Sequence, residues 1–131
     1  MYDRIILLNL IRCIMGNFQK LRVWQLAKEL AVKIYRITKS TSFSKDYGLR
    51  DQIQRAAVSI PSNIAEGDES GSNKLSVRYL YTAKGSVAEL QTQLIIAHEI
   101  GYIENDLKDS LINDCDKISI MLRKIITARS V

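Results

Sequence analysis

A helical repeat is clearest in residues 21–39, LRVWQLAKELAVKIYRITK. Its apolar residues recur at alternating steps of four and three, a spacing that places them on one face of an α-helix. We therefore predict a helix from Leu21 to about Lys39 with one face in a hydrophobic core. The residues on that face are Val23, Ala27, Leu30, Ile34 and Ile37.

The same repeat continues through the rest of the chain. It predicts three more helices, at residues 47–66, 73–100 and 106–128. Four helices with short connections predict an all-α fold, an up-down-up-down antiparallel four-helix bundle.

The predicted helices have recognisable ends. Asp46 and Ser72 are expected to be N-caps, because their side chains can accept from the free N–H groups of a first turn. Gly67 is expected to end its helix in a left-handed conformation, and Gly101 to end the next. Residues 40–45, STSFSK, interrupt the repeat with hydroxyl side chains that compete for backbone hydrogen bonds, so a loop is predicted there.

Residues 1–16 are set apart from these helices. The apolar run within them is interrupted by Asn9 and Arg12 and is shorter than the ~20 residues of a membrane-spanning helix. We interpret residues 1–16 as an N-terminal extension, with Met15 a candidate for the true start, and residues 17–131 as the bundle domain. An additional packed helix and a signal or anchor segment are the alternatives.

The apolar side chains exceed what one core needs. At 131 residues, 47% hydrophobic and 25% charged, the chain fits a single globular domain. Apolar residues nevertheless extend beyond the inner face of the predicted helices, which favours a cyclic homo-oligomer over a monomer. The additional residues are Trp24, Ala31, Tyr35, Ile95, Ile96, Ile112, Ile120 and Ile126.

Positive charge is concentrated in one half of the chain. Residues 16–66 carry a net +5, whereas residues 67–131 carry a net −1. Such asymmetry is typical of a surface that binds a polyanion such as RNA, although solvated lysines on helix surfaces explain it as well. The candidates for phosphate contact are Lys20, Arg22, Lys28, Lys33, Arg36, Lys39, Arg50 and Arg55.

Two polar stripes follow the middle helices. On antiparallel neighbours they would pair Arg55 with Glu89 and Arg78 with Glu66, and Gly85 would let the backbones approach. Such a network can fix the register of a bundle; a ligand-facing role is the alternative. Its members are Arg55, Ser59, Asn63, Glu66, Arg78, Gly85, Ser86 and Glu89.

The residue types that catalysis and metal binding require are sparse. Cys13, Cys115 and His98 are the only cysteines and histidine, and their spacing matches no zinc, di-iron or nucleophile–base motif. We predict no catalytic residue, no metal site and no cofactor. Cys115 lies at an apolar helical position and is expected to be a buried, reduced thiol in a cytoplasmic protein.

Several motifs resemble one known family. The segments are residues 18–21 (FQKL) with 23–25 (VWQ), residues 55–67 (RAAVSIPSNIAEG), and residues 83–86 (AKGS) with Glu89 and Leu94. They are similar to the four-helix-bundle proteins encoded in intervening sequences of bacterial large-subunit ribosomal RNA genes. The resemblance runs from about Asn17 to the C-terminus.

The resemblance implies a bundle that assembles into a ring, commonly a pentamer, with no known enzymatic activity. The family is also similar to the accessory proteins of diversity-generating retroelements, basic pentamers that bind nucleic acid and a reverse transcriptase. By that analogy the partners would be further copies of the chain, RNA or a ribonucleoprotein, and a reverse transcriptase. Asp68 and Glu69 stand where the family often has an aromatic or glycine and then an arginine, so this loop is not expected to contact phosphate.

Overall fold

The computed structural model describes residue 4 and residues 17–130, and the expectations for residues 1–16 fall outside this part of the chain apart from Arg4. The described residues form five α-helices and one 3-10 helix, with no strand among them. This confirms the all-α fold. The elements are η1 (Phe18–Lys20), α2 (Arg22–Ile37), α3 (Thr41–Lys45), α4 (Tyr47–Glu69), α5 (Asn73–Glu99) and α6 (Asn105–Arg129).

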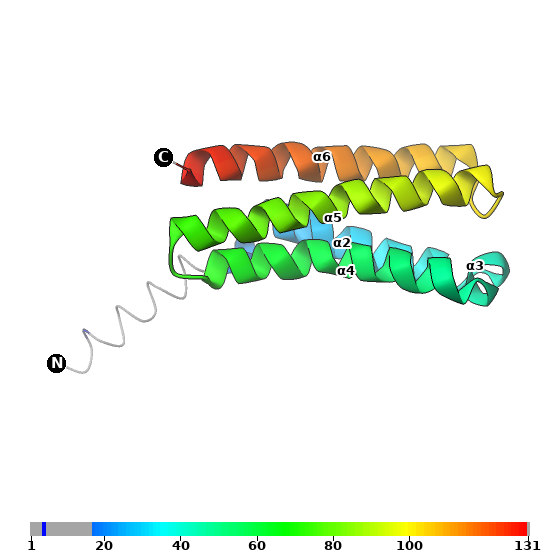
Figure 1. Ribbon diagram of the computed structural model, residues 1–131, viewed down its shortest axis with the longest axis horizontal. Helices are drawn as coiled ribbons and strands as arrows, with labels where there is room; N and C mark the ends of the chain where they lie inside the picture. Colours follow the sequence, from blue (N-terminus) through cyan, green and yellow to red (C-terminus); the bar gives the residue numbers. More distant parts are fainter. Residues whose placement is uncertain (1–3, 5–16, 131) are drawn as a thin grey trace.

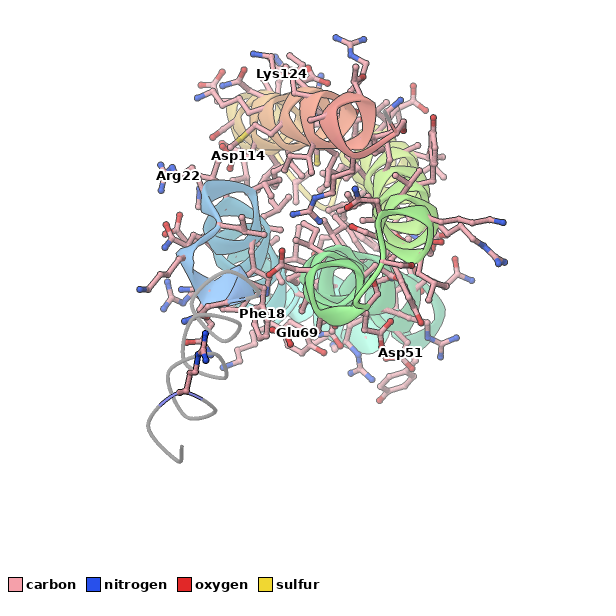
Figure 2. The ribbon with its side chains drawn as sticks, turned by 90° about the vertical axis from the view of Figure 1, so that its left-hand side faces the viewer. Phe18, Arg22, Asp51, Glu69, Asp114 and Lys124 are labelled. Carbon is pink, nitrogen blue, oxygen red and sulfur yellow. The ribbon has the colours of Figure 1, made fainter. Side chains whose placement is uncertain are left out.

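The four long helices lie side by side along one axis (Figure 1). α5 packs against both α4 and α6, and α2 packs against α4 and less extensively against α6. Viewed along the bundle, α2 and α5 lie on opposite sides of it (Figure 2). Among the helices of residues 17–130, none combines the length and hydropathy that a bilayer crossing demands.

The core is built from the predicted helix faces. On α2, four of the five predicted inward residues are buried and Ile37 is partly buried. Ala31 and Ile126, expected among the additional surface residues, are instead 8% and 5% exposed and belong to the core. Both lie at the edge of the inward arc of their helices, where neighbouring helices cover them. Tyr35, by contrast, is exposed as expected.

Local chemistry sets three of the helix ends. The Asp46 carboxylate accepts from the Leu49 N–H at 3.1 Å at the start of α4, and the Ser72 hydroxyl accepts from the Leu75 N–H at 3.2 Å at the start of α5. Gly101, just past α5, has φ 85°, a left-handed conformation that favours glycine. These N-caps and this helix end are confirmed.

The predicted stop at Gly67 is wrong. α4 continues through it to Glu69, and the left-handed residue is Gly71, with φ 79°. Gly67 is buried, and a β-carbon there would lie 3.1 Å from Tyr79 Cβ and 3.2 Å from the Ser76 carbonyl oxygen. The glycine therefore permits close packing of α4 on α5 rather than ending the helix.

The predicted loop at residues 40–45 also differs from the structure, which forms the short helix α3 there. Phe43 is fully buried, and its ring packs against Tyr102 with centroids 5.1 Å apart. The Tyr102 hydroxyl donates to Asp46 Oδ2 at 2.9 Å. These contacts with the α5–α6 connection fix a segment that local hydroxyl residues alone would leave irregular.

Candidate nucleic-acid interface

The outer face of α2 is basic. The helix is rich in strong helix formers, its apolar residues face the core, and Glu29 is its only acidic residue. Every cation it carries is exposed, so charge and core are separated across the helix. The exposed residues are Arg22, Lys28, Lys33 and Arg36, with Lys39 two residues beyond the end of the helix.

An open groove of about 430 Å³ follows the outer side of α2 beside α4. Its lining is mainly apolar, with Tyr35 44% and Val58 40% exposed. Cationic side chains stand among these apolar ones, so the groove combines positive charge with an aromatic face. It is lined by Lys28, Ala31, Val32, Tyr35, Arg36, Lys39, Val58 and Pro61.

The three cations of the groove are not neutralised. Within residues 17–130, Lys28, Arg36 and Lys39 form no ion pair and no side-chain hydrogen bond. An exposed cation without a carboxylate partner can contact a phosphate directly and release the counterion condensed on it. The structure therefore brings three of the eight phosphate-contact candidates together at one groove.

Two other candidates are engaged in the fold. Lys33 Nζ lies 2.9 Å from Asp114 Oδ2 and links α2 to α6. The Arg50 guanidinium lies over the Tyr47 ring, 4.8 Å from its centroid, and donates to Asp51 Oδ1 at 3.1 Å. A phosphate would have to compete with these contacts for either side chain.

The remaining candidates lie elsewhere on the surface. Lys20 belongs to η1, Arg22 begins α2, and Arg55 lies on α4; all are exposed, and none lines the groove. Sequence reasoning missed Tyr35 and Val58 as parts of this surface. The sequence indicated Tyr35 only as an apolar residue outside the core-facing arc of its helix, and it gave no sign that the residue lines a groove.

The polar stripes of α4 and α5 meet at their centre. The Ser59 and Ser86 hydroxyl oxygens lie 2.9 Å apart, and Asn63 Nδ2 donates to the Ser59 carbonyl and hydroxyl oxygens at 2.8 and 2.9 Å. The Ser59–Ser86 hydrogen bond ties α4 to α5 at one register, and Asn63 holds Ser59 from within α4. The sequence suggested Ser59, Asn63 and Ser86 for this role.

The expected ion pairs at the ends of these stripes do not form. In the described part of the chain, neither Arg55 with Glu89 nor Arg78 with Glu66 makes a salt bridge. All four side chains are exposed, where an ion pair gains little over hydration. Gly85 also does not mediate a close approach to α4, because a β-carbon added there meets nothing within 4 Å.

A second polar cluster closes one end of the bundle. Arg129 donates to Asp68 Oδ1 at 3.1 Å and to the Ser76 hydroxyl at 2.6 Å, joining the end of α6 to α4 and α5. The Asp68 side chain is only 5% exposed, and its Oδ2 is buried with no partner among the described residues. Asp68, which the sequence assigned to an acidic loop, is thus part of an interior ion pair.

The buried thiol lies apart from both polar clusters. Burial, with the nearby charges of Asp114 and Asp116, raises the pKa of Cys115 to about 12, so the reactive thiolate form is scarce at neutral pH. No group of three or more potential metal ligands occurs among the residues that the structure describes.

Fold and surface together define a small all-α bundle protein with three cations, unpaired among the described residues, along one outer groove. The chain belongs to the family of 23S rRNA-intervening sequence proteins, whose model matches residues 19–124. The match covers most of the described bundle and confirms the resemblance found in the sequence.

A solved structure gives the same fold. The chain is similar to a protein of unknown function from the S23 ribosomal protein family of Bacteroides thetaiotaomicron, at 27% sequence identity and a TM-score of 0.73. The alignment covers 79% of this chain and 97% of that one. No curated protein matches the chain.

Proposed function

We propose that this chain is a non-enzymatic, self-associating bundle protein that binds RNA through the groove between α2 and α4. The observation that carries the proposal is the rim formed by Lys28, Arg36 and Lys39, which have no acidic partner among the described residues. Phosphate contacts of this kind supply affinity and position, without reading base sequence.

The apolar part of the groove favours single-stranded RNA over a duplex. Tyr35 offers an aromatic side chain that is 44% exposed, and unstacked bases bind to such surfaces by stacking. A duplex keeps its bases stacked on one another and would use only the cations. Tyr35 therefore supplies a contact that only an unpaired region of RNA can use.

The proposed partners follow from this surface and from the family. They are RNA or a ribonucleoprotein, with a reverse transcriptase as a protein partner by analogy to the retroelement accessory proteins. A cytoplasmic setting fits both an RNA partner and the free, buried thiol of Cys115.

The salt dependence of RNA binding tests the proposal. Replacing Lys28, Arg36 and Lys39 with alanine is expected to weaken binding of a labelled single-stranded RNA at least tenfold. For single strands the logarithm of the binding constant changes with the logarithm of salt by about −0.7 per phosphate contact, so losing three contacts should flatten the slope by about 2. Fluorescence anisotropy at several salt concentrations measures both quantities.

A matched variant controls for net charge. Replacing Lys117, Arg123 and Lys124 with alanine removes the same formal charge from α6, and Figure 2 shows Lys124 pointing away from the bundle on that helix. This variant is expected to retain most of the affinity. Equal losses in the two triple variants, or absence of binding by the unmodified protein at low salt, would contradict the RNA proposal.

A second candidate function is a protein-interaction ring without RNA. It is favoured by the apolar lining of the same groove, which a neighbouring copy could fill. In both functions we propose that up-down-up-down antiparallel bundles assemble into a cyclic homo-oligomer, for which the family resemblance implies five copies. For the ring function, replacing Lys28, Arg36 and Lys39 with alanine is expected to change the mass of the assembly. Neither this variant nor the unmodified protein is then expected to bind RNA.

A further inference from the structure

A polar cavity of about 400 Å³ opens at the end of the bundle where α4 turns into α5 and where α6 ends. Figure 2 looks onto this end, with Glu69 labelled on the last turn of α4. Among the described residues, no aromatic or large apolar side chain lines the cavity, so it suits a small hydrophilic ligand. Its polar side chains are those of Asp68, Ser70, Ser72, Asn73, Ser76 and Arg129.

Hydrogen-bond donors converge on this cavity. The first N–H groups of α5 point out of the N-terminus of the helix, and those of Asn73 and Lys74 donate to no described residue. Arg129 uses two of its five N–H groups on Asp68 and Ser76, and the others remain for a ligand. A helix N-terminus and a guanidinium both favour an oxyanion.

One strong acceptor stands among these donors. The Asp68 side chain lines the cavity and is only 5% exposed, and its Oδ2 accepts no hydrogen bond from the described residues. A buried carboxylate oxygen without a donor is unfavourable. Because Asp68 lines the cavity, a ligand held there can supply the missing donor.

The donors and the acceptor together select an oxyanion that still carries a proton. Hydrogen phosphate has negative oxygens to accept from the donors and one O–H group to donate to Asp68 Oδ2. Sulfate has a similar shape but no proton at neutral pH, and a phosphate ester loses its last proton with a pKa of about 6. At neutral pH and above, hydrogen phosphate is the one of these three anions that meets both requirements.

We propose that this cavity binds inorganic hydrogen phosphate, with Arg129 and the N-terminus of α5 holding its negative oxygens and Asp68 Oδ2 accepting from its O–H group. From its sequence, this acidic turn is not expected to contact phosphate. In the fold, however, Asp68 turns inwards and Arg129 neutralises it, while Glu69 is exposed and does not line the cavity. The site is separate from the groove between α2 and α4 and does not depend on RNA binding.

Three anions of the same charge test the proposal on the unmodified chain. At about pH 8, hydrogen phosphate, methyl phosphate and sulfate are all mainly dianions, but only hydrogen phosphate has an O–H group. Isothermal titration calorimetry at constant ionic strength is expected to show methyl phosphate and sulfate binding at least tenfold more weakly than phosphate. Equal binding of the three anions, or no binding of phosphate, overturns the proposal.

The substitution Asn73→Asp locates the site. A carboxylate at the first residue of α5 favours the helix but repels a dianion bound at its N-terminus. Phosphate binding is therefore expected to weaken at least tenfold, while circular dichroism shows that the helices persist. Asn105→Asp makes the same change at the first residue of α6 and is expected to bind phosphate as the unmodified protein does. Equal affinities of the two variants overturn the site.

The substitution Asp68→Asn tests the acceptor. An asparagine amide can donate to either anion, so this variant is expected to bind sulfate as well as it binds phosphate. A folded variant that still prefers phosphate at least tenfold overturns the role of Asp68. If the variant does not fold, the three anions on the unmodified chain decide the same point.

The groove variant separates this site from the RNA proposal. Replacing Lys28, Arg36 and Lys39 with alanine is expected to leave phosphate binding unchanged, because none of the three lines the cavity. A loss of phosphate binding in this variant would place the anion in the groove and overturn the cavity site. Absence of RNA binding, by contrast, would contradict only the proposed function.

Discussion

Replacing Arg129 with methionine is expected to lower the free energy of unfolding by about 3 kcal/mol, since it leaves a buried carboxylate without its cationic partner. The Asp68 side chain is 5% exposed, and Arg129 supplies its hydrogen bond at 3.1 Å. The same substitution removes the donor to the buried Ser76 hydroxyl. Methionine preserves much of the side-chain volume, so the loss reports charge and hydrogen bonding. Urea unfolding at fixed protein concentration measures it.

A second substitution isolates the role of charge. Adding Asp68→Asn to Arg129→Met removes the unpaired carboxylate, and the double variant is expected to regain part of the lost stability. Arg123→Met, on the exposed side of the same helix, is the control and should change stability by less than about 0.5 kcal/mol. If Arg129→Met is as mild as this control, the ion pair does not stabilise the end of the bundle.

Replacing Gly67 with valine is expected to lower the free energy of unfolding by about 2 kcal/mol, because it overfills the contact between α4 and α5. Even the β-carbon would lie 3.2 Å from the Ser76 carbonyl oxygen, and a backbone atom of a packed helix cannot move aside cheaply. Branching at that carbon adds two further methyl groups in the same space. Thermal and urea unfolding both measure the change.

The matched control for this prediction is Gly48→Val, in the first turn of α4. A β-carbon at Gly48 would have the Asp46 carboxylate oxygen at 3.8 Å as its nearest neighbour, an ordinary contact. Valine has a somewhat higher helix propensity than glycine, so Gly48→Val is expected to leave the free energy of unfolding unchanged or to raise it by a few tenths of a kcal/mol. Equal effects at Gly67 and Gly48 would show that close packing of α4 on α5 is not the reason for Gly67.

The helices could be predicted because their signals are local. The spacing of Val23, Ala27 and Leu30 specifies which face of α2 is inward, and the caps at Asp46 and Ser72 act within one turn. Gly67 could not be interpreted in this way. The backbone of Gly67 is ordinary helix. A glycine is required there by the close packing of α5, which follows α4 after a turn and contacts Gly67 only in the folded protein.

The candidate interface could likewise be predicted only in part. The positive charge of the α2 region is visible in the sequence, but its grouping is not. Lys28 and Arg36 share the groove with Val58 only because α4 packs beside α2. The partnership of Asp68 with Arg129 joins residues far apart in the chain, and no spacing rule relates them.

Side-chain footprinting of two tyrosines tests most directly the claim that RNA binds in the groove between α2 and α4. Tyr35 lines the basic groove and Tyr81 lies on the outer face of α5; both are well exposed in the single chain. We expect added RNA to protect Tyr35 from hydroxyl radicals without changing Tyr81. RNA that protects both tyrosines equally, or neither, would contradict this account.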